Sequence, residues 1–224
     1  MSLFNREGTF KDYFKKAPVT STILIINLMM LIIVAITGGF NPYNLLRLGA
    51  LWSPLVIENN EWWRIITSMF LHGSFSHFLG NAVIGLYVLS GALERIIGSK
   101  KFFFIYFLSG IGAGLLVVFT SNALTIGASG AIFGALGSLL YIGIYRKDLM
   151  SVRDFQSIKG LVIFNIVFTF FGPNISVAGH IGGIVTGFLL SYLFIKNSKK
   201  IVNDYQYRHF DSYDKYDDDP WGES

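Results

Sequence analysis

Cysteine is absent from the 224-residue sequence, and charged residues are scarce in it. Without cysteine, the chain has no disulfide bond, no thiolate nucleophile and no cysteine-ligated zinc site. Charged residues make up 14% of the sequence, whereas hydrophobic residues make up 52%. This composition is too apolar for a soluble domain of such a length. It therefore predicts a protein that spans a membrane several times and has short soluble ends.

Six apolar segments, separated by basic or turn-forming residues, predict an all-α polytopic membrane protein with six transmembrane helices. The spans are expected at 21–37, 77–97, 102–120, 129–145, 159–171 and 177–195. The fifth is the shortest, and it is rich in phenylalanine. We therefore expect a basic N-terminal segment over 1–20, a six-span domain over 21–195 and a polar, acidic tail over 196–224.

Lys and Arg gather before the first span, between the second and third, between the fourth and fifth, and after the sixth. By the positive-inside rule, both termini are cytoplasmic, and spans two, four and six run from outside to inside. The N-terminal segment, with Phe10 and Phe14 among its lysines, suits either a helix on an anionic membrane surface or a solvated leader. The acidic tail is predicted to be a disordered cytoplasmic end.

The long connection over 38–64 does not span the membrane, yet it is too apolar for disorder. Loops of this length are usually functional or disordered. Its leucines and tryptophans favour an ordered loop at the level of the lipid headgroups. We expect its two carboxylates, Glu58 and Glu61, to be solvated.

Ser129 stands between Ala128 and Gly130 at the start of the fourth span, and two interpretations fit it. As a helix N-cap, its hydroxyl would accept a hydrogen bond from an otherwise unpaired backbone N–H. As a nucleophile, it would have small neighbours that admit a substrate backbone, and N–H groups of the first helical turn that can bind an oxyanion. Spacing alone does not separate the two interpretations.

Polar residues within the membrane are costly and are therefore candidates for function. His72, His77 and His180 fall near the outer ends of spans two and six, and Asn81 follows His77 on the same helix face. Ser129, His180 and His77 each lie 16 to 18 residues ahead of the basic residue that closes their span. At about 1.5 Å per residue, all three lie roughly 25 Å above the inner face. They are thus predicted to share one depth, just below the outer surface.

Two stripes of small residues predict that the fourth and sixth spans pack together. The fourth carries Gly130, Gly134 and Ser138, and the sixth carries small residues at the same four-residue interval from Gly179 through Gly183 onwards. Such stripes let helix backbones approach closely in lipid. One stripe begins just after Ser129 and the other just before His180, so a shared contact would bring these two residues together. The alternative is that each stripe packs on a different neighbour.

Most partners that could activate Ser129 are missing. Lysines after Lys16 cluster at the inner boundaries or in the tail, and the only carboxylate between Trp62 and Lys147 is Glu94, at the inner end of span two. The spacing of His72 and His77 suits a zinc site on one helix face poorly, and no His-Glu-x-x-His motif occurs. A Ser–His dyad remains, with His180 as the base and then the acid.

Four motifs occur in order along roughly residues 21–195. They are Trp63-Arg64, then His72-Gly-Ser-Phe-Ser-His77-Phe-Leu-Gly-Asn81, then Gly127-Ala-Ser129-Gly130, and finally His180-Ile-Gly-Gly183 with Gly187. In these motifs the sequence resembles the rhomboid intramembrane serine proteases of the bacterial type. The resemblance implies that 21–195 is a rhomboid-like catalytic domain, a six-span helical bundle.

Catalytic roles follow from the resemblance. It implies that Ser129 is the nucleophile and His180 the general base, without an aspartate. It also implies an oxyanion hole formed by His77, the Asn81 amide and the backbone N–H of Ser129. Gly127, Gly130 and Gly183 would provide substrate access and close helix packing.

Supporting roles are implied for Trp63 and Arg64, which would help to anchor the outer loop, and for His72. Two positions depart from the family pattern. Phe133 stands where a tyrosine is common; it can stack on the histidine but has no hydroxyl. Gly179 precedes His180 where alanine is common. Neither departure removes a catalytic group.

The predicted activity is hydrolysis of peptide bonds in or near transmembrane segments of other membrane proteins. We expect no cofactor, no metal and no nucleic-acid partner, and an active site that opens to the extracytoplasmic side of the cell membrane. The fifth span, with Phe164, Phe168 and Phe171, is either a mobile gate beside the second span or an ordinary lipid-facing helix. Two other classes stay open, namely a catalytically silent rhomboid-like protein that binds transmembrane clients, and a small channel or transporter. The sequence does not indicate the oligomeric state.

Overall fold

The fold was examined in a computed structural model, which describes residues 9–171 and 175–197. The predicted acidic tail, apart from its first two residues, and the turn at Gly172 lie outside the described residues. In chain order, the helices are α1 (Phe10–Lys16), α2 (Pro18–Thr37), α3 (Pro42–Arg47), α4 (Ser53–Glu58), α5 (Arg64–Thr67), η1 (Ser68–Phe70), α6 (Phe75–Leu79), η2 (Gly80–Ser90), α7 (Gly91–Ile97), α8 (Ser99–Thr120), α9 (Ser129–Tyr145), η3 (Lys147–Leu149), α10 (Val152–Phe171) and α11 (Val177–Ile195).

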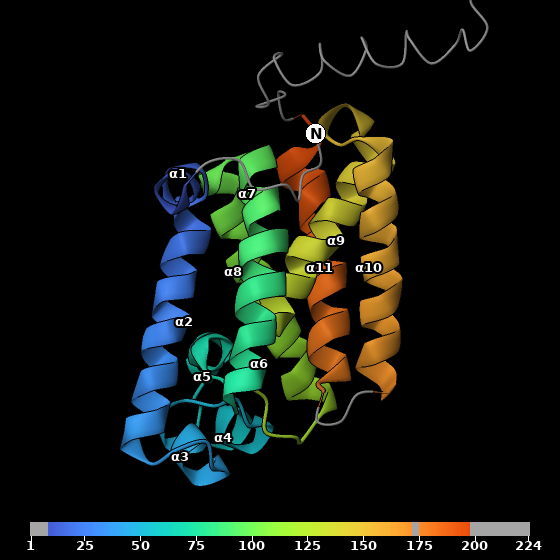
Figure 1. The fold of residues 1–224 in the computed structure, drawn as a ribbon. Helices are drawn as coiled ribbons and strands as arrows, with labels where there is room; N and C mark the ends of the chain where they lie inside the picture. The colour runs from blue at the N-terminus through green and yellow to red at the C-terminus, as the bar shows by residue number, and fades with distance from the viewer. Residues whose placement is uncertain (1–8, 172–174, 198–224) are drawn as a thin grey trace, which may run out of the picture.

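Six helical segments run side by side along the long axis of the molecule (Figure 1). Five are long and apolar enough to cross a membrane: α2, the continuous segment Phe75–Ile97, α8, α10 and α11. The sixth, α9, is apolar but has only 17 residues. The chain is therefore a helical, multi-pass membrane protein, as the sequence predicts.

The predicted length of the fifth span is wrong. Instead of a short helix over 159–171, α10 runs over 20 residues from Val152. The basic residues Arg153 and Lys159, which predict a link between the fourth and fifth spans, lie on the helix itself. Ser151 starts the helix, because its hydroxyl accepts a hydrogen bond from the Asp154 N–H at 3.1 Å and donates one to the Asp154 carboxylate at 2.8 Å.

Helix α9 forms the centre of the bundle, and α11 packs against it more extensively than against any other helix. A Cβ added at Gly183 would lie 2.0 Å from the Gly130 carbonyl oxygen, and one at Gly187 would lie 2.0 Å from the Gly134 carbonyl oxygen. The backbones therefore touch, which only glycine permits. We call these four residues the glycine seam. The contact of Gly183 with Gly130 is followed, four residues later on both helices, by that of Gly187 with Gly134, so α9 and α11 run parallel. The predicted pairing of spans four and six is confirmed.

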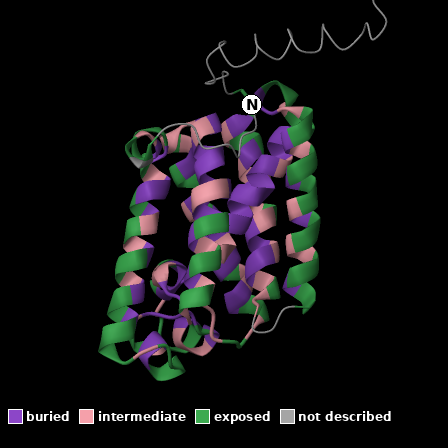
Figure 2. Ribbon diagram, viewed as in Figure 1, coloured by how far each residue is buried: buried purple, intermediate pink, exposed green. Residues whose placement is uncertain are grey.

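Helix α10 lies at the edge of the bundle and packs against α9 and, to a smaller extent, α11 (Figure 1). Much of its surface is exposed (Figure 2). Phe164, Phe168 and Phe171 are 64%, 52% and 84% exposed, so their rings face away from the protein and toward the place that lipid would occupy. A lipid-facing role explains their exposure, while a gating role remains a prediction.

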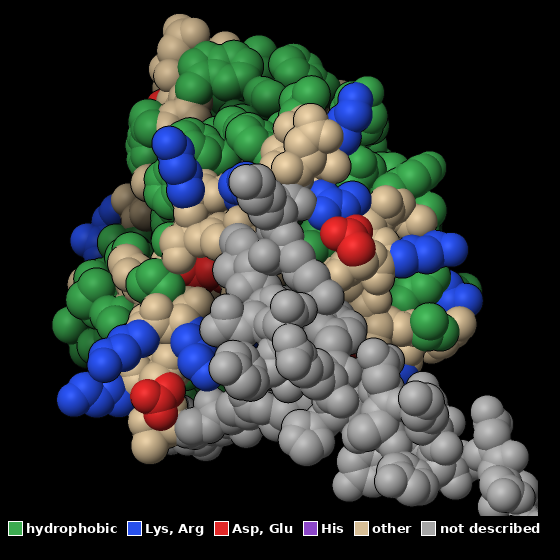
Figure 3. Space-filling view, turned by 90° about the horizontal axis from the view of Figure 1, so that it is seen from above, with side chains coloured by type: hydrophobic (Ala, Val, Ile, Leu, Met, Phe, Trp, Pro, Cys, Tyr) green, Lys and Arg blue, Asp and Glu red, His purple; other side chains and the backbone are tan. Residues whose placement is uncertain are grey.

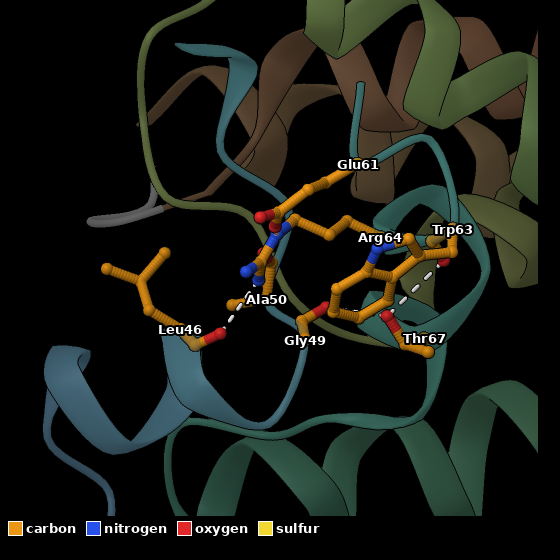
Figure 4. A network of polar contacts seen from close by, with 7 residues as sticks. All are labelled: Leu46, Gly49, Ala50, Glu61, Trp63, Arg64 and Thr67. Atoms are coloured by element: carbon orange, nitrogen blue, oxygen red, sulfur yellow. Dashed lines mark hydrogen bonds and ion pairs between the residues drawn. The ribbon is translucent and has the colours of Figure 1, made fainter. Parts of the chain in front are cut away.

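The connection over 38–64 is ordered, as predicted, and it folds into short helices at the end of the bundle far from α1 (Figure 1). Arg64 organises it, because its guanidinium donates to the carbonyls of Leu46 at 2.7 Å and Ala50 at 3.0 Å (Figure 4). The prediction that Glu58 and Glu61 are solvated is confirmed for Glu58, which is exposed, but only in part for Glu61. The Glu61 side chain is 28% exposed, and its carboxylate forms an ion pair that neutralises Arg64, whose side chain is 8% exposed. Trp63 packs beside this guanidinium, 4.6 Å from ring centre to Arg64 Cζ.

The opposite end of the bundle carries many Lys and Arg side chains (Figure 3). There the Glu94 carboxylate, 1% exposed, accepts hydrogen bonds from the N–H groups of Val19 at 2.9 Å and Thr20 at 2.7 Å. It thereby caps the first turn of α2, where unpaired N–H groups favour a negative charge. Helix α1 is tied to this end by Tyr13, whose hydroxyl donates to the Tyr87 carbonyl at 2.8 Å.

Candidate active site

The segment that leads into α9 is fixed by the connection over 38–64 and by η1. Leu51 and Thr125 exchange two backbone hydrogen bonds, of 3.0 and 2.8 Å, and the Gly127 N–H donates to the Ser68 carbonyl at 2.9 Å. Gly127 has a φ of +118°, a conformation that favours glycine. These contacts set where α9 begins, and hence where Ser129 lies.

Ser129 is the first residue of α9, and its hydroxyl does not cap the helix. The N-cap residue is Ala128, which provides no side-chain hydrogen bond. Within the described part of the chain, the Ser129 hydroxyl has no hydrogen-bond partner, and the first backbone bond of α9 runs from the Ile132 N–H to the Ala128 carbonyl at 3.0 Å. The N–H groups at the start of the helix therefore remain available to an acceptor. The capping interpretation of Ser129 is not supported by this geometry.

His77 and Asn81 approach the same place from the second span. The Ser74 hydroxyl accepts the His77 N–H at 3.1 Å and so starts α6 just before these residues. A Cβ added at Gly127 would lie 2.9 Å from His77 Nε2 and 3.5 Å from Asn81 Nδ2, so all three residues surround one point. The Asn81 Nδ2 atom is buried and has no hydrogen-bond partner among the described residues. A buried donor without an acceptor is unfavourable, and it suggests that an acceptor binds there during function.

Asn81 also lies in an unusual part of the helix. Residues Gly80–Ser90 form η2, an 11-residue stretch of π-helix. Stretches of π-helix are rare and occur often at functional sites. No pattern in the amino-acid sequence indicates this winding.

His180 lies in the first turn of α11, which Ser176 caps by accepting the Gly179 N–H at 3.1 Å. The imidazole is 9% exposed and is held from two sides. Its face stacks on the Phe133 ring, with 3.8 Å between ring centres and 16° between planes. Its Nδ1 atom lies 2.8 Å from the Thr169 hydroxyl of α10.

The glycine seam brings Ser129 and His180 to one end of the bundle. A Cβ added at Gly130, the residue after Ser129, would lie 3.6 Å from the carbonyl oxygen of Gly179, the residue before His180. No hydrogen bond joins the Ser129 hydroxyl to the imidazole in this structure. Such bonds are often long or absent in a substrate-free enzyme and tighten in the complex.

A small cavity of about 30 Å³ lies beside Ser129. This volume accommodates at least one water molecule. Its polar lining residues are Ser68, Thr125, Ser129 and Ser176, together with glycines of α8, α9 and α11.

His72 lies next to the site, behind the His77 ring, and not in the site itself. Its ring is fully buried in an edge-to-face contact with His77, at 5.1 Å between centres, and neither ring nitrogen has a hydrogen-bond partner among the described residues. Burial, followed by the nearby His77, lowers the pKa of His72 to about 3. His72 is therefore neutral at physiological pH and supports the packing of His77.

The structure thus gathers Gly127, Ser129, His77, Asn81 and His180 at one end of the bundle. Phe133 contacts the His180 ring, Gly130 and Gly183 form the seam beneath, and Trp63 and Arg64 anchor the loop instead of lining the site. In the described residues, no cluster of three or more His, Asp or Glu side chains could hold a metal ion.

Thr169 is a site residue that the sequence reasoning missed. A signal was present, because Asn165 and Thr169 are polar residues four apart in an otherwise phenylalanine-rich span. The rule that polar residues within the membrane are functional candidates applies to this pair as it does to the histidines.

Comparison with known proteins identifies the family. The model of the rhomboid domain matches residues 59–197, well over half of the chain. The chain is 30% identical to YdcA of Bacillus subtilis, whose name assigns it provisionally to the rhomboid proteases, over 88% of this chain and 99% of YdcA. It is 34% identical to rhomboid protease GluP of the same organism, over 77% of this chain but only 34% of GluP. It is 32% identical to rhomboid-like protease 1 of Toxoplasma gondii, over 68% of this chain and 53% of that protein. The chain belongs to the rhomboid family.

Proposed function

We propose that this protein is an intramembrane serine endopeptidase that cleaves peptide bonds in or near transmembrane segments of membrane proteins. One observation carries the proposal: the Ser129 hydroxyl caps no helix and lies at a helix N-terminus beside the unpaired, buried Asn81 amide. Family membership and the names of the relatives support the same class of activity. If the Ser129 side chain served only to cap the start of α9, its hydroxyl would be expected to accept a hydrogen bond from a backbone N–H of the first turn.

In the proposed reaction, the Ser129 oxygen attacks the scissile carbonyl carbon while His180 Nε2 takes the hydroxyl proton. The carbonyl oxygen becomes an oxyanion, which accepts hydrogen bonds from the Ser129 N–H, the Asn81 amide and His77. His180 then protonates the leaving amine, and the C–N bond breaks to leave an acyl ester on Ser129. A water molecule attacks the ester. The 30 Å³ cavity is lined by Ser129 but not by His180, so it can store a water near Ser129 from which the attacking position is filled. His180 takes the proton of the water and returns it to the Ser129 oxygen.

The substrates proposed are transmembrane helices, which must unwind locally because their carbonyls are already hydrogen-bonded. The site lies at the end of the bundle opposite the basic one. By the positive-inside rule, the basic end faces the cytoplasm and the site opens to the extracytoplasmic side. A reporter that is active only outside the membrane, fused after Ser224, is expected to be silent; a clear signal would contradict this orientation.

A serine-directed fluorophosphonate tests the activity. The purified protein in lipid is expected to be labelled on Ser129, and the label is expected to vanish in Ser129→Ala and to fall sharply in His180→Ala. The same preparation, incubated with a panel of single-span substrates, should cleave at sites that mass spectrometry places in or near the span. Equal labelling of wild type and Ser129→Ala would rule out the proposed nucleophile, and the absence of both labelling and cleavage would favour a client-binding role.

A further inference from the structure

Among the described residues, the hydrogen-bond partner of the His180 imidazole is Thr169 of α10. Its side chain is 3% exposed, although α10 is otherwise largely exposed. The hydroxyl oxygen lies 2.8 Å from His180 Nδ1 and 2.7 Å from the carbonyl oxygen of Asn165, one turn earlier in α10. The Asn165 side chain bonds to the Leu161 carbonyl at 2.8 Å, so it does not take part in the contact with His180.

The two distances favour one placement of the Thr169 hydroxyl proton and of the His180 imidazole proton. A hydroxyl has a single proton to donate, and a carbonyl oxygen can only accept. If Thr169 donates to the Asn165 carbonyl, its oxygen can accept a proton from His180 Nδ1, and both contacts are hydrogen bonds. If Thr169 instead donates to Nδ1, the two oxygens lie 2.7 Å apart with no proton between them. The first arrangement is favoured, and it places the proton of the neutral imidazole on Nδ1.

Phe133 alone does not select this arrangement. Rotation of the imidazole by 180° about the Cβ–Cγ bond preserves the stack on Phe133 but exchanges Nδ1 with a carbon atom. Only a group at the ring edge distinguishes the two orientations, and Thr169 is such a group. Stacking therefore fixes the plane of the ring, and the Thr169 hydroxyl fixes its direction within that plane.

We propose that Thr169 is a positioning residue, which holds His180 as the Nδ1–H tautomer through a relay that ends at the Asn165 carbonyl. The Nε2 atom then carries the lone pair that can accept the Ser129 proton. This inference rests on the proposed function, since it assigns Thr169 the orienting role that a buried carboxylate has in Ser-His-Asp triads. A neutral hydroxyl stabilises the imidazolium less than a carboxylate does, so its removal should cost far less than the roughly 10⁴-fold of the carboxylate.

Three variants test the proposal. Thr169→Val keeps the shape of the side chain but removes the hydroxyl, and Thr169→Ser keeps the hydroxyl. Ser157→Ala is the matched control, because it removes a hydroxyl of the same helix that donates to the Arg153 carbonyl at 3.2 Å, twelve residues before Thr169. For each, we would measure the rate of fluorophosphonate labelling of Ser129 in lipid and the melting temperature. In parallel, ¹⁵N NMR of ring-labelled histidine would report which nitrogen of His180 is protonated, with the signal assigned through His180→Asn.

The expected result is labelling about 10- to 100-fold slower in Thr169→Val, as for loss of one hydrogen bond to a charged group. Thr169→Ser and Ser157→Ala should label within about threefold of the wild type, and all melting temperatures should be similar. Wild-type His180 should carry its proton on Nδ1, and Thr169→Val should lose this preference.

Several results would overturn the inference. They are wild-type labelling in Thr169→Val, an Nε2–H tautomer in the wild type, and slow labelling in Thr169→Val that is not restored in Thr169→Ser or that follows the loss of folded protein. Failure of the proposed function looks different: the wild type is then not labelled, or Ser129→Ala labels equally well. That result would remove the purpose of positioning His180, while the NMR experiment would still report whether Thr169 sets the tautomer of the imidazole.

Discussion

Helices α9 and α10 both touch the His180 ring, but they are held in the bundle in different ways. Twelve of the 17 residues of α9 are buried, and its backbone touches that of α11 along the glycine seam. Only four of the 20 residues of α10 are buried, and phenylalanine rings cover its outer face. The face of the imidazole therefore rests on a rigid support, whereas its Nδ1 edge depends on a helix with few neighbours.

This difference teaches how a membrane enzyme can combine precision with access. Backbone contacts between glycines leave no side chain to reorganise, so the position of α11 relative to α9 is well determined. A loosely packed helix can move at lower cost, because it breaks fewer contacts. If α10 moves to admit a substrate, the hydrogen bond between Thr169 and His180 must stretch or break, so the movement changes how the imidazole is held.

The largest effect is expected at the seam. In Gly183→Leu, the new side chain would collide with the Gly130 carbonyl, so α9 and α11 must separate and His180 must shift relative to Ser129. A shift of about 1 Å can cost on the order of 100-fold in rate, and we expect the loss here to be at least that large. Gly160→Leu in α10 is the matched control, because nothing lies within 4 Å of a Cβ at that position. Equal cleavage rates in the two variants would contradict the contrast between the helices.

The second prediction concerns the donor supplied by η2. Asn81→Ala is expected to lower turnover by about 10²–10³, or roughly 2.7–4 kcal/mol, the usual cost of losing one oxyanion-hole donor. Because the Asn81 Nδ2 atom has no hydrogen-bond partner in the described structure, its loss should leave the melting temperature nearly unchanged. Fluorophosphonate should still label this variant, though more slowly. A loss of turnover explained entirely by unfolding would make Asn81 a packing residue.

The third prediction compares one substitution on the two helices. Phe133→Leu in α9 removes the ring that stacks on His180, and stacked aromatic pairs contribute roughly 0.5–1.5 kcal/mol, so labelling should slow about two- to tenfold. Phe168→Leu in α10 changes a ring that is 52% exposed, and labelling by a small phosphonate should stay within about twofold. Slower labelling in Phe168→Leu than in Phe133→Leu would contradict the difference between the two helices.

The smallest effect at neutral pH is expected for His72→Leu. Burial lowers the pKa of His72 to about 3, whereas an unfolded histidine titrates near 6.5, so only the unfolded chain takes up this proton between those values. Stability is therefore lost as the pH falls from about 6.5 toward 3, by up to about 1.4 kcal/mol per pH unit for this group. Melting temperatures at pH 7.5 and pH 5 should differ less in His72→Leu than in the wild type. Parallel pH dependence in the two proteins would contradict the assignment.

The sequence predicted the helices that bear the site better than the others, for a physical reason. Helices α9 and α11 match their predicted spans, 129–145 and 177–195, because a small-residue stripe and a closing basic residue mark each of them. The boundary of α10 was misplaced because its charged first turns resemble a loop, although Ser151 starts the helix ahead of them.

Other features depend on contacts that no local pattern encodes. The π-helical winding of η2 and the ion pair between Glu61 and Arg64 are outcomes of tertiary packing. Predicting the hydrogen bond between Thr169 and His180 would require knowing which face of α10 points inward, and the many phenylalanines of that helix conceal this. The motifs located the reacting groups, but not the groups that orient them.

The shortness of α9 has a consequence for the membrane as a permeability barrier. At about 1.5 Å per residue, its 17 residues span roughly 25 Å, less than the approximately 30 Å of a typical hydrocarbon core. Because longer helices surround it, the end of the bundle that holds Ser129 can be recessed at its centre, which would let water approach Ser129 from that side. Below Ser129, the buried apolar residues of α9 close the path to the opposite side. Hydrolysis at membrane depth then requires no continuous water column, so the protein can admit its co-substrate without conducting protons or ions.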